Sequence, residues 1–301
     1  MGDSHTSTDG NARDPAPRRD KLPARVRLHA IVSAVAALLA CAGWLWAQPA
    51  TDQQQKSKKP AAKPVRVLFV GNSYTSAHDL PAIVRALGAA SQPKVEYAIE
   101  SITPGGFTLE AHLAAEGKDA PRARIAAGAC DFVVLQEQSQ RPILEPDKML
   151  AAARLFAKEL AAAKATPLWY ATWARQAKPE TQADLDKAYE ACLAATGGRL
   201  APVGAAWRRV LTAKDENDRV ALHDKDGSHP SAAGSYLAAL VIHATLSGGK
   251  LDGLPARLAE PRPKTGDKPA EERVLVELEP RVAKLLQQAA TATLEARKKP
   301  R

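Results

Sequence analysis

An aspartate and a histidine three residues apart could supply a catalytic base and the carboxylate that orients it. They occur in the segment Asp226-Gly227-Ser228-His229-Pro230. A carboxylate on the same turn as an imidazole can accept the Nδ1 proton and leave Nε2 free to take a proton from a nucleophile. The same residues are also compatible with an Asp that caps a turn and a His exposed in a loop.

Ser73 is the candidate nucleophile, because it directly follows the first apolar run of the chain. Residues 65–70 read Val-Arg-Val-Leu-Phe-Val and residues 71–75 read Gly-Asn-Ser-Tyr-Thr. A serine just past a strand, on a turn into a helix, would carry its hydroxyl at the edge of a sheet. Thr75 occupies the place of the second Gly of a Gly-x-Ser-x-Gly elbow, and the segment lacks a phosphate-binding Lys. Taken alone, it could be an ordinary loop and helix cap.

Short β-branched and apolar runs alternate with alanine-rich segments of helical period from residue 65 onward. This alternation predicts an α/β fold in which a central parallel sheet is covered by helices on both faces. Ligands in such sheets bind beyond the carboxyl ends of the strands, which is where Ser73 would lie. The predicted strands are residues 65–70, 95–99, 132–135, 168–172 and 200–203, and the predicted helical segments are residues 80–90, 109–127, 147–163, 182–195 and 236–246.

The Ser73 segment and the Asp-x-x-His-Pro segment together resemble the first and last sequence blocks of the SGNH (GDSL-like) hydrolase superfamily. The resemblance extends over residues 65–246. It implies a three-layer, flavodoxin-like fold and a triad of Ser73, His229 and Asp226. It implies no cofactor and no metal ion.

The same resemblance indicates which groups would stabilise a negatively charged oxygen during the reaction. Besides the Ser73 N–H, it implies the N–H of Gly106, which follows the second predicted strand and has no Cβ to block an approach. Family members usually carry an Asn amide after the third strand, where this chain has Gln136, Gln138 and Gln140. An ungapped alignment favours Gln140, whereas an early end of the strand favours Gln136. The choice among the three amides stays open.

Aromatic and basic residues in and after the fourth predicted strand are candidates for contacts with the substrate. Trp169, Tyr170 and Trp173 could form a sugar-stacking wall and Arg175 a carboxylate clamp, or they could be packing residues. The Leu-Gln-Glu-Gln-Ser run at 135–139 resembles that of an SGNH-like subgroup associated with polysaccharide metabolism. This resemblance implies an esterase that removes O-acetyl groups from a carbohydrate through an acyl-enzyme.

Two alternatives to that function remain at this point. One is a carbohydrate-binding protein on the same fold whose catalysis weakened when the oxyanion Asn was lost. The other is a lipid esterase or thioesterase, although the sequence has no long apolar lid segment beside the candidate residues. The acyl group and the alcohol of the substrate, as well as the oligomeric state, stay open.

Composition excludes several classes of protein. The 301 residues are 45% hydrophobic and 25% charged, which excludes wholesale disorder, collagen and multi-span membrane proteins. The net charge is +9, but most of the excess lies in residues 1–66 and 297–301 without interleaved aromatics, so we expect no nucleic-acid partner. Three cysteines exclude a four-thiolate zinc site, and whether Cys130 and Cys192 pair stays open.

The N-terminal sequence indicates export. A basic cluster precedes an apolar run that could be a signal or a membrane anchor, so we expect an extracytoplasmic protein, periplasmic or secreted, or anchored to the inner membrane. Cleavage, retention and lipidation at Cys41 stay open. The predicted segments are a leader (1–29), the signal or anchor (30–47), a polar tether (48–64), the hydrolase domain (65–254), and a connector with a C-terminal helix (255–301). Within the last segment, a charged connector is predicted over 255–272 and an amphipathic helix over 274–294.

Overall fold

The computed structural model describes residues 63–128, 130–261 and 272–298 of the chain. Outside the described residues lie the predicted leader, the predicted anchor, Cys41 and nearly all of the predicted tether. Export of the protein therefore stays a prediction. Within the described ranges, no helix is both long and apolar enough to cross a membrane.

Five parallel strands form the central sheet, as the sequence predicts. Their order is β2-β1-β3-β4-β5. The three interior strands are largely apolar and buried on both sides, which is typical of a sheet covered on both faces. Their bounds are β1 (Val65–Val70), β2 (Tyr97–Ile102), β3 (Phe132–Leu135), β4 (Thr166–Tyr170) and β5 (Arg199–Ala201).

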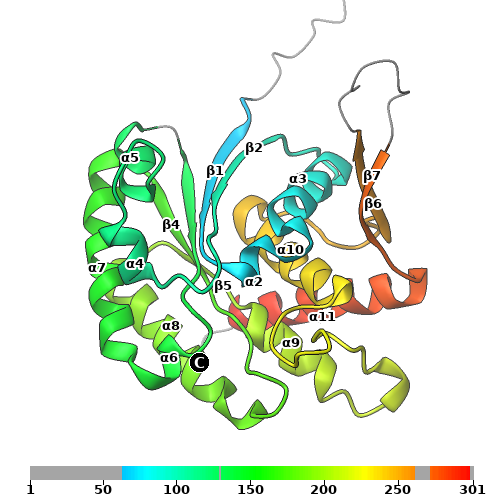
Figure 1. Cartoon of the computed structure of the whole chain (residues 1–301). Coiled ribbons are helices and arrows are strands. Elements are labelled where there is room, and N and C mark those ends of the chain that lie inside the picture. The colour runs from blue at the N-terminus through cyan, green and yellow to red at the C-terminus, as the bar shows by residue number, and fades with distance from the viewer. Residues whose placement is uncertain (1–62, 129, 262–271, 299–301) are drawn as a thin grey trace, which may run out of the picture. The chain divides into compact units, whose positions relative to one another are not determined.

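Helices cover both faces of this sheet and give the predicted three layers (Figure 1). Val67 and Phe69 of β1 lie in the core of one face, and Leu68 and Val70 lie in the core of the other. The first face is covered by α3 (Leu80–Ala90), α9 (Val203–Leu211) and α10 (Ala232–Ser247), and α11 (Pro280–Lys298) packs against α9 and α10. The second face is covered by α4 (Leu109–Ala114), α5 (Pro121–Ala126), α7 (Pro146–Ala163) and α8 (Gln182–Thr196).

The strand order places a topological switch point between β1 and β3. The chain leaves β1 toward one edge of the sheet and later continues through β3 toward the other edge, so the loops after β1 and β3 diverge. A crevice beyond the carboxyl ends of the strands at such a point is where open α/β sheets bind ligands. Two short helices follow these strands here, α2 (Ser73–Ser76) after β1 and α6 (Arg141–Leu144) after β3.

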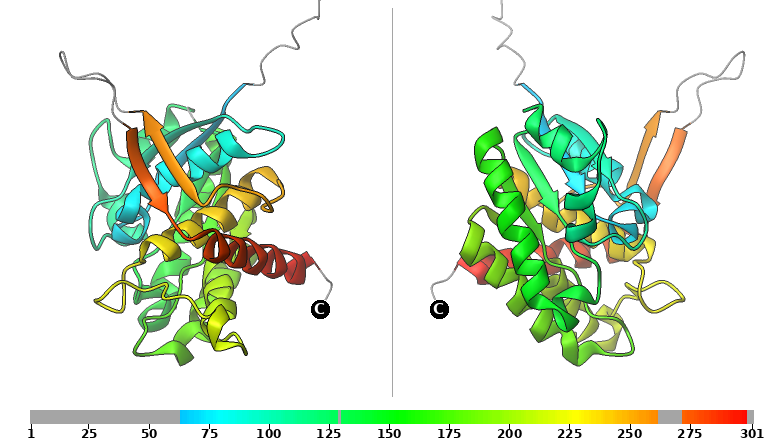
Figure 2. Two further views of the ribbon diagram at one scale, coloured as in Figure 1. Left: turned by 90° about the vertical axis from the view of Figure 1, so that its right-hand side faces the viewer. Right: turned by 60° about the vertical axis from the view of Figure 1, so that its left-hand side comes forward.

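The C-terminal region differs from its prediction. The predicted connector over 255–272 contains β6 (Arg257–Pro261), which pairs antiparallel with β7 (Glu272–Glu277), and the last helix begins only at Pro280. This hairpin and α11 lie on the outer side of α3 and α10 (Figure 2). Arg273 of β7 donates hydrogen bonds to Glu260 and to Asp79, so the hairpin is also tied to the segment before α3.

Candidate functional site

A tight turn between β1 and α2 presents Ser73. Asn72 caps α2, because its Oδ1 accepts a hydrogen bond from the backbone N–H of Tyr74 at 3.1 Å. A Cβ on Gly71 would lie 2.6 Å from the side-chain oxygens of both Gln136 and Thr75. Glycine is therefore required at position 71, where the backbone passes so close to two side chains.

A second turn, before α10, presents His229. Gly227 has a φ of 65°, and the chain reverses there so that Asp226 and His229 face each other. Asp226 Oδ1 accepts the backbone N–H groups of Ser228 and His229, each at 2.9 Å. The carboxylate is thus held in one orientation by its own turn.

The two turns meet and form the predicted row of side chains. Ser73 Oγ lies 2.9 Å from His229 Nε2, and His229 Nδ1 lies 2.5 Å from Asp226 Oδ2. The hydrogen bond from His229, followed by the two backbone N–H groups, holds the pKa of Asp226 well below its usual range. Asp226 therefore remains a carboxylate, keeps the Nδ1-protonated tautomer, and leaves Nε2 to accept the Ser73 proton.

Two residues that the sequence interpretation did not single out support this row. The Tyr74 hydroxyl lies 2.7 Å from Ser228 Oγ, and the Tyr74 ring meets the His229 ring edge-on with 5.6 Å between centroids. Trp173 Nε1 donates to the Ser228 carbonyl at 3.0 Å. Tyr74 and Ser228 are neighbours of predicted site residues in the sequence, and that adjacency was the only available signal.

The loop that carries Gly106 is fixed to the turn of the nucleophile. Asn72 Nδ2 donates to the carbonyl of Phe107 at 2.9 Å, and Gly106 has a φ of 71°. A Cβ built on Gly106 would meet no atom within 4 Å, so the space beside it is open. Among the described residues, neither Gly106 N–H nor Ser73 N–H donates a hydrogen bond. Both are free to bind an oxyanion.

Of the three glutamines that the sequence left open, Gln136 has no free side-chain N–H to serve as the third donor. The side chain is buried and faces the turn of the nucleophile. Its Oε1 accepts from Asn72 N at 2.9 Å and from Thr75 Oγ1 at 2.8 Å, and its Nε2 donates to Asn72 Oδ1 at 3.0 Å and to the Glu137 carbonyl at 2.5 Å. Both amide protons are used, and Gln136 braces the Ser73 turn from behind.

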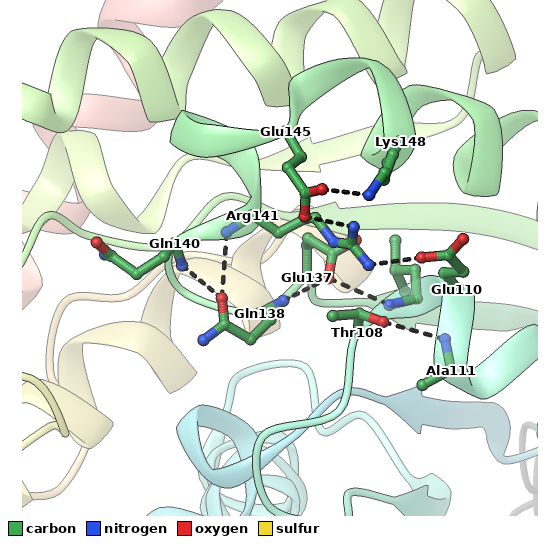
Figure 3. A network of polar contacts seen from close by, with 10 residues as sticks. Thr108, Glu110, Ala111, Glu137, Gln138, Gln140, Arg141, Glu145 and Lys148 are labelled. Carbon is green, nitrogen blue, oxygen red and sulfur yellow. Dashed lines mark hydrogen bonds and ion pairs between the residues drawn. The ribbon is translucent and has the colours of Figure 1, made fainter.

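Gln138 combines a fixed amide with a free N–H pair. Its Oε1 accepts the backbone N–H groups of Gln140 at 2.7 Å and of Arg141 at 3.1 Å, at the start of α6. Figure 3 shows that Oε1 points into this network and that the side-chain nitrogen points away from it. Gln140 Nε2 instead lies against the Ser139 carbonyl at 3.4 Å, a weak contact. Gln138 is the better-organised donor.

Known structures resemble the fold of this chain. A protein from Slackia heliotrinireducens assigned to the SGNH hydrolases matches with a TM-score of 0.52 and 29% sequence identity, over 62% of this chain and 100% of that one. The chain belongs to the SGNH hydrolase superfamily. Two further structures align less closely: TesA, with 17% identity over 61% of this chain and 98% of that one (TM-score 0.48), and the acetyl xylan esterase AlAXEase, with 14% identity over 59% and 98% (TM-score 0.47). No family model and no curated protein matches the sequence.

Trp173 of this SGNH hydrolase is not a sugar-stacking surface, contrary to one interpretation of the sequence. The side chain is 1% exposed and lies between two rings, with centroids 4.7 Å from Tyr74 and 3.8 Å from Trp207. Trp169 and Tyr170 are also buried, because β4 is an interior strand with a core on each face. Of these aromatics, Trp173 supports the site directly, through its contacts with Tyr74 and Ser228.

Arg175 lies at the surface beside the site. Its Nη2 donates to Ser139 Oγ at 3.2 Å, and the next residue, Gln176, donates its backbone N–H to the Gly227 carbonyl at 2.9 Å. The loop after β4 therefore joins the Gln138 loop to the His229 turn. Arg175 forms no ion pair with an acidic residue of the described ranges, so its charge is available to a ligand.

Cys130 and Cys192 do not form a disulfide. Both thiols are free and buried in the core on the α7 and α8 side of the sheet. Burial raises the pKa of both thiols, that of Cys192 to about 12, which makes them unreactive packing residues.

Replacement of Trp173 by alanine is expected to lower the free energy of unfolding by about 3–5 kcal/mol, because it removes a buried ring from between two others. Trp173→Phe keeps a ring and loses only the indole N–H, so it should cost much less. Urea unfolding of both variants measures the difference. A raised KM with unchanged stability in Trp173→Ala would instead indicate a sugar-binding ring.

Proposed function

We propose that this SGNH hydrolase is a serine esterase that works through a covalent acyl-enzyme. The observation that carries the proposal is the continuous hydrogen-bonded row from Ser73 through His229 to Asp226 at the carboxyl edge of the sheet. It lies at the switch point between β1 and β3, where ligands of such sheets bind.

In the proposed reaction, Ser73 Oγ attacks the ester carbonyl while His229 Nε2 takes its proton. The N–H groups of Ser73 and Gly106 and the Gln138 amide stabilise the tetrahedral oxyanion. His229 then donates the proton to the leaving alcohol, and the acyl group remains on Ser73. A water molecule, deprotonated by His229, releases the acid and restores the free hydroxyl.

We further propose that the substrate is an O-acetyl group on a carbohydrate. The side chains of His229 and Asp226 are 40% and 49% exposed, so a bulky alcohol can reach the triad from solvent. The loops after β3 and β4 carry polar side chains that are at least partly exposed: Gln138, Gln140 and Arg175. Hydrogen-bonding groups of this kind suit a sugar, and an open site offers a long acyl chain little apolar surface.

The acyl preference of the full chain tests this substrate class. p-Nitrophenyl esters of acetate, butyrate and octanoate are compared by kcat/KM, together with acetate release from an acetylated oligosaccharide. We expect kcat/KM for octanoate to be at least about tenfold below that for acetate, since added methylenes gain value only where they are buried. A rate that rises with chain length would contradict the acetyl assignment and favour a lipid esterase.

A further inference from the structure

The carboxyl group of Glu137 is buried beside the site and has no role in the proposed reaction. The residue is 0% exposed and follows β3 by two positions. Its Oε1 accepts the backbone N–H of Gln138 at 2.6 Å and that of Leu109 at 3.1 Å. Its Oε2 has no hydrogen-bond partner among the described residues. A buried carboxyl is costly, and an apolar side chain would fill the space without that cost.

The two N–H groups that Glu137 holds belong to the two loops that carry candidate oxyanion donors (Figure 3). Leu109 begins α4, three residues after Gly106. The carbonyl of Phe107 is held from the other side by Asn72. A single carboxyl oxygen therefore joins the end of the Gly106 loop to the backbone of Gln138.

We propose that Glu137 is a positioning residue that sets the separation of the Gly106 N–H and the Gln138 amide, so that both reach the same oxyanion. The inference rests on the proposed esterase function. Preorganised donors stabilise an oxyanion only at hydrogen-bond distance, and a displacement of about 1 Å can cost about 10²-fold in rate. Without the Oε1 acceptor, the two loops would be joined here only through the Arg141–Glu110 ion pair between the helices that follow them.

Charged neighbours of Glu137 come from α4 and α6. Arg141 of α6 forms ion pairs with Glu110 of α4 and with Glu145, each at 2.6 Å, and its charge favours the ionised form of Glu137. Glu110 opposes it. Burial is the largest effect and raises the pKa of Glu137 to about 7.

Tyr189 and Cys192 of α8 interact with Glu137 and are neutral near pH 7, as is His112 of α4. Burial lowers the pKa of His112, whose Nε2–H donates to the Gly71 carbonyl at 2.7 Å. Burial raises the pKa of Cys192 to about 12 and also raises the pKa of Tyr189. The Tyr189 hydroxyl accepts a hydrogen bond from the Glu137 N–H at 3.2 Å. Ionisation of Glu137 near pH 7 should therefore strengthen its bonds to Leu109 and Gln138, because a carboxylate is the stronger acceptor.

Variants of the full chain test the positioning role by separating the acceptor from the charge. Glu137→Gln keeps an acceptor oxygen, whereas Glu137→Leu removes it. Glu145→Gln makes the same charge change on a neighbour that is only partly buried and is the control. We expect kcat for p-nitrophenyl acetate to fall about 10²-fold in Glu137→Leu with little change in KM, and only a few-fold in Glu137→Gln and in the control. A folded Glu137→Leu with kcat near that of the unmodified chain overturns the proposal, as does equal loss in both Glu137 variants.

The backbone amide resonances of Leu109 and Gln138 provide a test that needs no turnover and no leucine variant. In the unmodified full chain, both amide proton shifts should move downfield together with a midpoint near pH 7, and Glu137→Gln should abolish the movement. If neither resonance titrates, the proposed link between the loops is overturned. If both titrate but no ester is hydrolysed, the link stands and the proposed function fails.

Discussion

Replacement of Ser73 by alanine is expected to lower kcat for p-nitrophenyl acetate by about 10⁶-fold, to the level that binding and the oxyanion donors alone provide. The hydroxyl at 2.9 Å from His229 Nε2 is the group that forms the acyl-enzyme in this account. Since Ser73 and His229 act as one unit, His229→Ala and the double variant should be about as slow as Ser73→Ala. Asp226→Asn should cost about 10⁴-fold, because an amide favours the wrong tautomer of His229.

Ser76 offers a matched control for Ser73. It lies in the same short helix, is exposed, and makes no side-chain capping bond. Ser76→Ala should retain the rate of the unmodified chain. Comparable rates in Ser73→Ala and Ser76→Ala would contradict the enzyme interpretation and favour a binding protein on the same fold.

Loss of the Gln138 amide should lower kcat by about 10²–10³-fold with a small effect on KM, which is the usual cost of removing one oxyanion donor. Gln138→Glu is the most informative variant, because a carboxylate keeps the acceptor that binds Gln140 N and Arg141 N and removes the donor. The added negative charge also opposes an oxyanion.

Gln140→Glu places the same charge two residues further along the same loop and is the control for Gln138→Glu. Its amide makes only the 3.4 Å contact to Ser139, so we expect a loss of less than about tenfold. If Gln140→Glu were the damaging substitution and Gln138→Glu the mild one, the third donor would be Gln140, as the ungapped alignment suggests.

Local patterns were sufficient to predict most of the sheet. The predicted strands over 65–70 and 132–135 coincide with β1 and β3, since continuous β-branched and apolar runs suit a strand buried on both faces. The second strand was placed two residues too early. The Val95 N–H donates to the Gly88 carbonyl at 2.9 Å and so closes the end of α3, and pairing with β1 begins at Tyr97.

The C-terminal region shows why local pattern was not sufficient there. Residues 272–278 read Glu-Arg-Val-Leu-Val-Glu-Leu, which fits a strand as well as the start of the predicted helix over 274–294. Pairing with β6 decides for a strand, and Leu275 and Val276 become buried. Pro280, which suits the first turn of a helix, marks the true start of α11.

The candidate site, too, could be predicted from the sequence only in part. Asp226 and His229 could be paired from sequence because they lie three positions apart on one turn. The roles of the glutamines could not be assigned, because they depend on bonds to Asn72 and Arg141 that only the folded loops create. Trp173 was misplaced for a related reason, since only the folded core brings Trp207 against it.

The most direct test of the central claim is the site of covalent modification by a fluorophosphonate, which phosphonylates an activated serine and leaves a stable tetrahedral oxyanion mimic. The full chain is treated with the reagent, and the adduct is located by intact mass and peptide mapping. We predict one adduct per chain, on Ser73, with none in Ser73→Ala and strongly slowed labelling in His229→Ala. An adduct on another residue, or an active chain that remains unlabelled at Ser73, would contradict the account.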